Sequence, residues 1–420
     1  MEKTEKDPQD LLKERMKRVE DAVQLKVPDR VPFVPSYSFF PMKYAGISFR
    51  EAMYDYDKFE AAFKKFILDF EPDMYVNLHG LIPLGATLEI LDYKPLKWPG
   101  HGIDSYRSYQ YVEGEYMKAE EYDEFLSDPS GFMLKTFFPR VYGALEPLSM
   151  LPPLPWLHDY YKTVPSLAVL GTSEMAGALE SLLKAGAEAY RMRTKAGEFT
   201  RQLKALGFPC EWGAAAAAPF DYFGDCLRGM RGVMLDMHRN QEKLLEAMDK
   251  ILPLLLETAK FTAAKSGTPI VYHFLHRCAD NFMSPEQFKT FYWPTLRKLM
   301  LGLIEHGLTP CAYFEGNCGS RLDIIGDIPK AKAIYRFAET DIFRAKQVLG
   351  GQVCLRGNVP ASMLCLGTPE QIRAYCKKLI DLVGRDGGFI MDGGTGIPDE
   401  AKVENVKAMA EVTKEYGVYR

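Results

Sequence analysis

The chain has 420 residues, of which 47% are hydrophobic and 26% charged, with a formal net charge of −4. This is the composition of a globular protein with a large core, and its slight acidity does not favour nucleic acid or an anionic membrane surface as a partner. Residues 1–10 are charged and lack the apolar stretch of a secretion signal, and no run of about 20 apolar residues forms a membrane span. The eight cysteines include no C-x-x-C pair. We therefore expect a cytoplasmic protein with reduced thiols.

The predicted elements begin with a charged helical extension over residues 1–28, followed by one barrel domain over residues 29–420. In that domain short apolar or β-branched runs alternate with longer amphipathic stretches. The eight predicted strands are 31–37, 73–79, 209–216, 269–276, 309–315, 332–339, 352–358 and 387–393. Eight strand–helix repeats predict an α/β fold, a parallel sheet closed into a (β/α)8 TIM barrel.

Two gaps between strands, 296–305 and 369–383, have the apolar spacing of amphipathic helices. The gap between the second and third predicted strands is too long for one helix, and we interpret it as a long insertion acting as a lid or specificity segment. It contains a Tyr- and Pro-rich part, 93–122, and a weak strand candidate, 166–171, which we assign to a helix flank.

Polar side chains close most of the predicted strands, at the end of a TIM barrel where active sites lie. Asn77 and His79 end the second strand, His276 and Arg277 the fourth, Tyr313 and Glu315 the fifth, Glu339 the sixth, Arg356 and Asn358 the seventh, and Asp392 the eighth. Their convergence predicts a polar, hydrogen-bonded pocket at the mouth of the barrel.

His276, Glu315 and Asp392 are the predicted catalytic residues. His273 lies three positions before His276, so a strand directs the two rings to opposite faces, and we place His276 in the mouth. Glu315 follows an apolar run, where an unpaired carboxylate is costly. The alternative is a structural role, with His276 as a capped histidine and Asp392 as a turn residue.

A histidine and carboxylates from neighbouring strands suit a zinc ion, with His276, Glu315 and Glu339 as the predicted ligands. Zinc would polarise an ether or alcohol oxygen and make it a better leaving group. A metal-free alternative uses Glu315 as general acid with His276 as its partner. The strand-end residues predicted to bind substrate are His79, Asn77, Tyr313, Arg356 and Asn358.

Segments of the C-terminal half share their order and spacing with one enzyme superfamily. They are 282–288 (FMSPEQF), 292–294 (YWP), 315–317 (EGN), 357–360 (GNVP), 367–370 (GTPE), 393–398 (GGTGIP) and 404–409 (ENVKAM). They resemble the uroporphyrinogen decarboxylase superfamily, which also contains zinc-dependent and corrinoid-dependent methyltransferases. The resemblance implies the same barrel fold.

Within that superfamily, the resemblance implies methyl transfer instead of porphyrin decarboxylation. True decarboxylases carry arginines after the first strand and an aspartate at the end of the second, where this chain has SYSFF (36–40) and VNLH (76–79). Methyltransferases that activate a thiol use a His-x-Cys pair and a further cysteine, where this chain has Tyr313, Glu315 and Thr395. Carboxylate in place of thiolate makes an oxygen-rich site, which favours a methyl donor bound through oxygen.

The branch with this character resembles the methyltransferase I component of anaerobic O-demethylases. It implies that a small O-methyl donor, with a methoxyaromatic compound as the first expectation, gives its methyl group to cob(I)alamin. The chain has no D-x-H-x-x-G motif, so the cobalamin would be carried by a separate corrinoid protein. The aromatic residues of the insertion expected to stack on a substrate ring are Tyr93, Trp98, Tyr106, Tyr109 and Tyr111.

Three alternatives stay open. A decarboxylase or lyase would use Arg356 or Arg277 to hold a carboxylate on its substrate. A methylcobalamin-dependent transfer to a thiol is the second alternative, and a binding subunit without chemistry is the third. The sequence also leaves the oligomeric state open, with a homodimer as one arrangement.

Overall fold

The computed structural model describes residues 6–419 and contains a parallel sheet of six strands in the order β4-β5-β6-β7-β8-β9. The strands are β4 (Ala214–Ala215), β5 (Ile270–Leu275), β6 (Thr309–Phe314), β7 (Ile334–Phe337), β8 (Cys354–Val359) and β9 (Phe389–Gly393). All neighbouring pairs are parallel. The last five predicted strands therefore coincide with β5–β9, and the third is reduced to the short β4.

The first three predicted strands take part in the sheet through isolated contacts. Phe33 forms a parallel bridge with Met391 of β9, and Tyr75 forms one with Cys210, in the segment that continues into β4. Between the first and second segments, the Asp73 N–H donates to the Phe33 carbonyl at 2.8 Å. The eight predicted segments thus follow one another in the ring order of a TIM barrel, with one or a few backbone hydrogen bonds in place of a continuous ladder at three junctions.

Proline explains why the first segment does not form a regular strand. Pro32 and Pro35 lie within residues 31–37 and have no backbone N–H to donate to a neighbouring strand. The prediction of a full strand there was wrong, although the chain runs where the barrel needs it.

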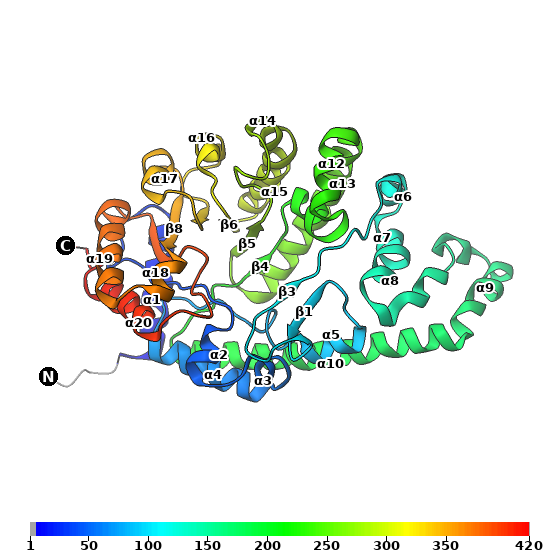
Figure 1. Cartoon of the computed structure of the whole chain (residues 1–420), viewed down its shortest axis with the longest axis horizontal. Helices are drawn as coiled ribbons and strands as arrows, with labels where there is room; N and C mark the ends of the chain where they lie inside the picture. The colour runs from blue at the N-terminus through cyan, green and yellow to red at the C-terminus, as the bar shows by residue number, and fades with distance from the viewer. Residues whose placement is uncertain (1–5, 420) are drawn as a thin grey trace.

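Helices cover the outside of the strands in an arc (Figure 1). The N-terminal helices are α1 (Pro8–Val23), α2 (Phe40–Ala45), α3 (Phe49–Tyr54) and α4 (Tyr56–Phe70). Those after β4 are α11 (Pro219–Asp221), α12 (Gly229–Arg239), α13 (Gln241–Ser266), α14 (Pro285–Gln287), α15 (Trp293–Glu305), α16 (Leu322–Ile325), α17 (Ile342–Leu349), α18 (Ala361–Leu366), α19 (Pro369–Leu379) and α20 (Val403–Glu415). The two gaps predicted to be helical fall in α15 and α19, the latter continued by a π-helical turn.

The predicted insertion packs on the main core through residues such as Trp98 and Tyr122, and from there an arm extends to the far end of the molecule (Figure 1). It holds a small sheet of β1 (Leu96–Pro99), β2 (Gly102–Ile103) and β3 (Gln110–Tyr111), in the order β2-β1-β3. Its helices are α5 (Gly85–Leu91), α6 (Tyr122–Ser127), α7 (Pro129–Phe132), α8 (Phe138–Val141), α9 (Tyr160–Leu167) and α10 (Ser173–Ala205). The long α10 runs from the barrel to α9 at the far end of the arm (Figure 1). Residues 166–171 are helical, as expected.

Helix α1, in the predicted extension, closes the amino-terminal end of the barrel. Its Val19 and Ala22 pack with Val34, Ile270 and Ile390, which point into the interior from three segments of the ring. Residues 1–5 of the predicted extension lie outside the described range.

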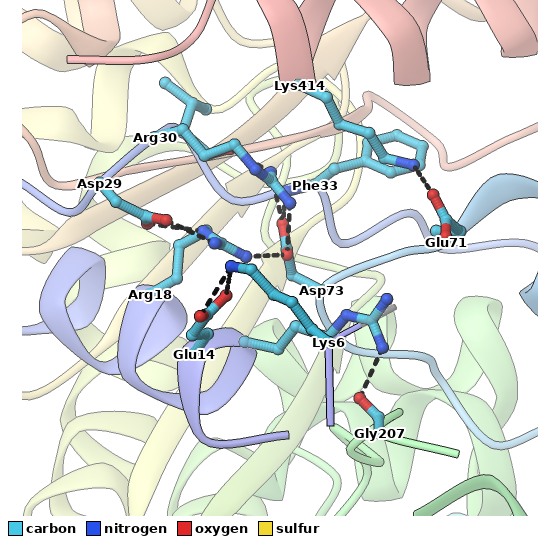
Figure 2. Close-up of polar contacts among 12 residues, drawn as sticks. Lys6, Glu14, Arg18, Asp29, Arg30, Phe33, Glu71, Asp73, Gly207 and Lys414 are labelled. Carbon is cyan, nitrogen blue, oxygen red and sulfur yellow. Dashed lines mark hydrogen bonds and ion pairs between the residues drawn. The ribbon is translucent and has the colours of Figure 1, made fainter. Parts of the chain in front are cut away.

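A buried carboxylate fixes α1 to the ring. Asp73 is fully buried and accepts hydrogen bonds from the guanidinium groups of Arg18 and Arg30 and from the Phe33 N–H at 2.7 Å (Figure 2). Arg18 also pairs with Asp29. One side chain thus joins α1, the first segment and the second segment, which have no continuous ladder between them.

Within residues 6–419 no helix is long and apolar enough to span a membrane. The eight cysteines, which all lie within residues 6–419, are free.

Candidate functional site

The ends of β5 and β6 bring the two leading candidates together. The Glu315 N–H donates to the Leu275 carbonyl at 3.3 Å, which holds the two strand ends in register. Nε2 of His276 lies 3.6 Å from Oε1 of Glu315, and both side chains are 41% exposed. The imidazole and the acid therefore meet at the carboxyl end of the strands, accessible to solvent, as the sequence predicts.

The neighbouring histidine faces the other way. His273 is fully buried, and its Nδ1 lies 2.8 Å from the Ala216 carbonyl oxygen, to which it donates. The argument from strand alternation is thus confirmed for these two rings.

A carboxylate that sequence reasoning missed lies on the other side of His276. Oδ2 of Asp225 is 2.6 Å from Nδ1 of His276, and its Oδ1 accepts from Nε of Arg277 at 3.0 Å. Asp225 sits in a π-helical turn, Tyr222–Leu227, directly after α11. The site therefore contains a carboxylate–imidazole–carboxylate row: Asp225, His276, Glu315.

Asp221 anchors this row from beneath. It is buried and accepts from the backbone N–H groups of His276 at 3.1 Å and Arg277 at 3.2 Å, and from the Tyr292 hydroxyl at 2.5 Å. Both aspartates follow the third predicted strand, four residues apart. That position after a strand was the signal that could have found them.

The charges of the row are strongly coupled. Burial lowers the pKa of His276, but the Asp225 hydrogen bond and the charges of Asp225 and Glu315 outweigh burial and raise it to about 9. Burial raises the pKa of Glu315, with the charges of His276 and Arg336 opposing. Burial also raises the pKa of Asp221, to about 7. At neutral pH the row presents an imidazolium, with Nδ1 bound to Asp225 and Nε2 on the side of Glu315.

Tyr313 and Arg336 lie deeper in the barrel than this row. They are register partners on β6 and β7, and Cζ of Arg336 stands 4.0 Å from the centre of the Tyr313 ring. Tyr313 was predicted to bind substrate, and the structure places it two residues below Glu315 on the same face. Arg336 is a further residue that the sequence did not single out, because it lies inside a strand and not at its end.

The structure corrects the expectation that Arg356 and Asp392 face the substrate, because both are completely buried. The Arg356 guanidinium donates to Asp392, Glu211, the Tyr272 hydroxyl, the Val34 carbonyl and the Ser36 hydroxyl, at 2.6–2.9 Å. A guanidinium has five N–H groups, and these five bonds use them all. Arg356 and Asp392 form an internal network that joins strands across the barrel.

The structure also corrects the placement of His79. This ring is buried between Phe59 and Phe199, which belong to α4 and α10, and its Nε2 lies 3.0 Å from Oε1 of Glu60 on α4. Its Nδ1 is 2.8 Å from Oδ1 of Asn77. His79 therefore fixes outer helices to the second segment and does not open into the mouth.

The remaining strand-end residues have separate surroundings. Asn358 is nearly buried and donates from Nδ2 to the Thr340 carbonyl at 2.9 Å, so it ties β8 to the loop after β7. Glu339 is exposed, and no hydrogen bond or ion pair joins it to another side chain among residues 6–419.

The donor atoms at the mouth can be compared with the needs of zinc. The 3.6 Å between His276 and Glu315 is close to the separation of two ligand atoms on one tetrahedral ion. Asp225 occupies the opposite nitrogen of the ring, so it cannot share that ion with Glu315. In the described part of the chain no group of three or more His, Cys, Asp or Glu side chains gathers as a ligand set. The pair His276 and Glu315 therefore offers fewer protein ligands than the three that are usual in catalytic zinc sites.

One aromatic residue of the insertion lies beside the mouth. Tyr111 of β3 is 81% exposed, yet the surrounding protein and the charges of Glu315 and Asp225 raise the pKa of its phenol. Trp98, also expected to stack on substrate, is instead fully buried, and its Nε1–H donates to the Tyr54 hydroxyl.

A family model described as uroporphyrinogen decarboxylase (URO-D) matches residues 177–416, more than half of the chain. The chain belongs to this family. Among URO-D enzymes, it is 28% identical to the uroporphyrinogen decarboxylase of Chlorobium phaeovibrioides over 137 residues, 32% of this chain and 38% of that enzyme. It is 32% identical to that of Methylococcus capsulatus over 116 residues, 28% of this chain and 33% of that enzyme. The match thus spans well under half the length of these relatives.

A solved structure shares the fold of this URO-D family chain almost from end to end. It is a methyltransferase from Methanosarcina mazei, which superimposes with a TM-score of 0.62 over 96% of this chain and 98% of its own, at 15% identity. The predicted superfamily and the TIM-barrel fold class are confirmed.

Proposed function

We propose that this protein is a methyltransferase that takes the methyl group of an O-methyl compound, a methoxyaromatic one in the first place, and passes it to cob(I)alamin on a separate corrinoid protein. The observation that carries the proposal is the row Asp225–His276–Glu315 at the open end of the barrel. The family and the methyltransferase of the same fold support it.

The difficult part of such a reaction is the departure of the oxygen. When the methyl carbon leaves, the electron pair of the C–O bond stays on the oxygen, which then needs a proton. Nε2–H of His276 supplies that proton, and the product is a phenol or alcohol. Asp225 holds Nδ1 at 2.6 Å, which fixes the ring and stabilises its charged form. The corrinoid supplies the nucleophile that receives the methyl group.

Zinc is the alternative means of activating the same oxygen. His276 and Glu315 would hold it, and its Lewis acidity would replace the imidazolium proton. The described residues offer two donors at this point, whereas a catalytic zinc site usually has three protein ligands. The zinc site stays a prediction.

One of the two arginines named for a decarboxylase is fully engaged. Arg356 has no free N–H and therefore cannot hold a substrate carboxylate. Arg277 is partly exposed and uses its Nε–H on Asp225 at 3.0 Å. The loss of Arg356 as a carboxylate ligand counts against the lyase alternative.

The test is methyl transfer from 4-methoxybenzoate to cob(I)alamin, followed by the absorbance change of the corrinoid and by the phenol formed. His276→Gln should lower the rate about 100-fold or more, because the proton donor is lost while the side chain stays polar. His306→Gln is the matched control, since this histidine is exposed at the end of α15. Full activity of His276→Gln would overturn the proposal.

A further inference from the structure

Two arginines on neighbouring strands differ sharply in how they are bonded. Arg336 of β7 and Arg356 of β8 are register partners, and both point into the barrel. Arg356 uses all five of its N–H groups. Arg336 is 3% exposed, yet its guanidinium makes one hydrogen bond, from Nη2 to the Gly394 carbonyl at 3.3 Å. Its buried Nε has no hydrogen-bond partner.

The nearest acid cannot satisfy Arg336. Asp392 is the one carboxylate within 4.0 Å of it among residues 6–419, with Oδ2 at 3.3 Å from Nε and no hydrogen bond between them. Asp392 already accepts from the Ser36 N–H and hydroxyl, the Gly393 N–H and Arg356, at 2.7–2.9 Å. Four donors fill the lone pairs of a carboxylate. A buried cation with unused donors is costly unless an anion binds to it.

The walls next to Arg336 are aromatic. The Tyr313 ring lies 4.0 Å from Cζ of Arg336, and the Phe274 ring meets the Tyr313 ring edge-on at 6.3 Å. Trp212 follows at 5.9 Å from Phe274, and both of these rings are half-buried. Flat apolar walls beside a guanidinium fork suit a planar ring that carries a carboxylate.

Arg336 lies deeper in the barrel than His276, so a substrate held there by its carboxylate would extend towards the mouth. Its strand partner Tyr313 lies two residues below Glu315, and Phe274 lies two residues below His276. Two residues of a strand span about 6.6 Å, the scale of one benzene ring with its substituents. A ring held at Arg336 by its carboxylate can therefore extend from the level of Tyr313 and Phe274 towards the level of Glu315 and His276.

We propose that Arg336 is a substrate-binding residue that holds the carboxylate of an aromatic methyl donor, with Tyr313 and Phe274 against its ring. This rests on the proposed function for the role of the ligand, but the binding of an aromatic carboxylate can be measured without methyl transfer. The substrate class is thus narrowed from methoxyaromatic compounds in general to those that carry an acid group.

The binding test is calorimetric titration of the full chain with benzoate and with benzamide, which has the same shape and no charge. Benzoate should bind about tenfold or more tightly than benzamide, and Arg336→Gln should remove that difference while leaving benzamide unchanged. Arg336→Lys keeps the charge without the fork, guards against a misfolded variant, and should retain part of the preference. Arg344→Gln, an exposed arginine of α17, is the matched control. Equal affinity of the unaltered chain for benzoate and benzamide would overturn the inference, as would undiminished benzoate binding to Arg336→Gln.

Turnover separates this inference from the proposed function. If Arg336 holds the acid, Arg336→Gln raises KM for 4-methoxybenzoate by a much larger factor than KM for methoxybenzene, which has no carboxylate. Arg336-dependent binding of benzoate without any methyl transfer would contradict the proposed function and support the carboxylate-binding site. Transfer from both methyl donors with equal KM in the unaltered chain would contradict the carboxylate-binding site and support the proposed function.

Discussion

Lowering the pH from 7 to 5 is expected to destabilise the fold through one buried histidine. His273 is fully buried on β5, its Nδ1–H donates to the Ala216 carbonyl, and its Nε2 has no partner. Burial therefore lowers the pKa of His273 from 6.5 to about 4, since nothing compensates a charge at Nε2. The unfolded chain takes up a proton below pH 6.5, whereas the folded chain resists one until pH 4. Stability is then lost as the pH falls through this window.

The size of the effect follows from the two pKa values. Over the whole window the difference corresponds to about 3 kcal/mol, and about 2 kcal/mol of it falls between pH 7 and pH 5. Urea unfolding followed by circular dichroism at both pH values measures the change. His273→Asn keeps a donor near the Ala216 carbonyl and removes the titrating nitrogen.

The comparison of the two proteins isolates His273, because other groups, including Asp221, titrate in both. The unaltered chain should lose about 2 kcal/mol more than His273→Asn between pH 7 and pH 5. An identical pH dependence in the two proteins would refute the reasoning.

The other predictions concern buried charges and the metal. Arg356→Met should lower the free energy of unfolding by about 3–5 kcal/mol, because it leaves Glu211 and Asp392 buried without their cation; a urea midpoint equal to that of the unaltered chain contradicts this. Asp73→Asn should cost about 2–4 kcal/mol, since Arg18 and Arg30 lose their shared carboxylate, and the same titration measures it. If His276 and Glu315 hold zinc, metal analysis of the purified chain gives about one ion per molecule and Glu315→Ala loses it; metal-free protein with full activity contradicts the zinc prediction.

The C-terminal half of the fold could be predicted because its strands are short, apolar and separated by clear helical repeats. The first half was harder to predict for a local reason. Residues 31–37 contain two prolines, so this segment joins the ring through isolated bridges instead of a regular strand. The tie that holds this half together is Asp73, which ends no strand and precedes an apolar run. A single carboxylate binding two arginines leaves no periodic pattern in the sequence.

Position at the end of a predicted strand identified some of the site residues and missed others. It found His276 and Glu315, because strand alternation and register fix where those side chains point. It did not find Asp225, which comes from a helical turn 51 residues before His276 and meets the ring only in three dimensions. It also overvalued His79, whose partners lie on α4 and α10 and belong to the outside of the barrel.

The two arginines show what decides between structure and function inside a barrel. Arg336 and Arg356 are both arginines, and they occupy paired positions on the adjacent parallel strands β7 and β8. What separates them is the supply of acceptors: Glu211, Asp392 and three neutral oxygens surround Arg356, whereas the acid nearest Arg336 is already filled by four other donors. Burial alone would class both as structural. Counting donors against acceptors instead shows that Arg336 keeps unused donors beside a carboxylate that four other groups already fill, which is why we propose that a substrate carboxylate binds to it.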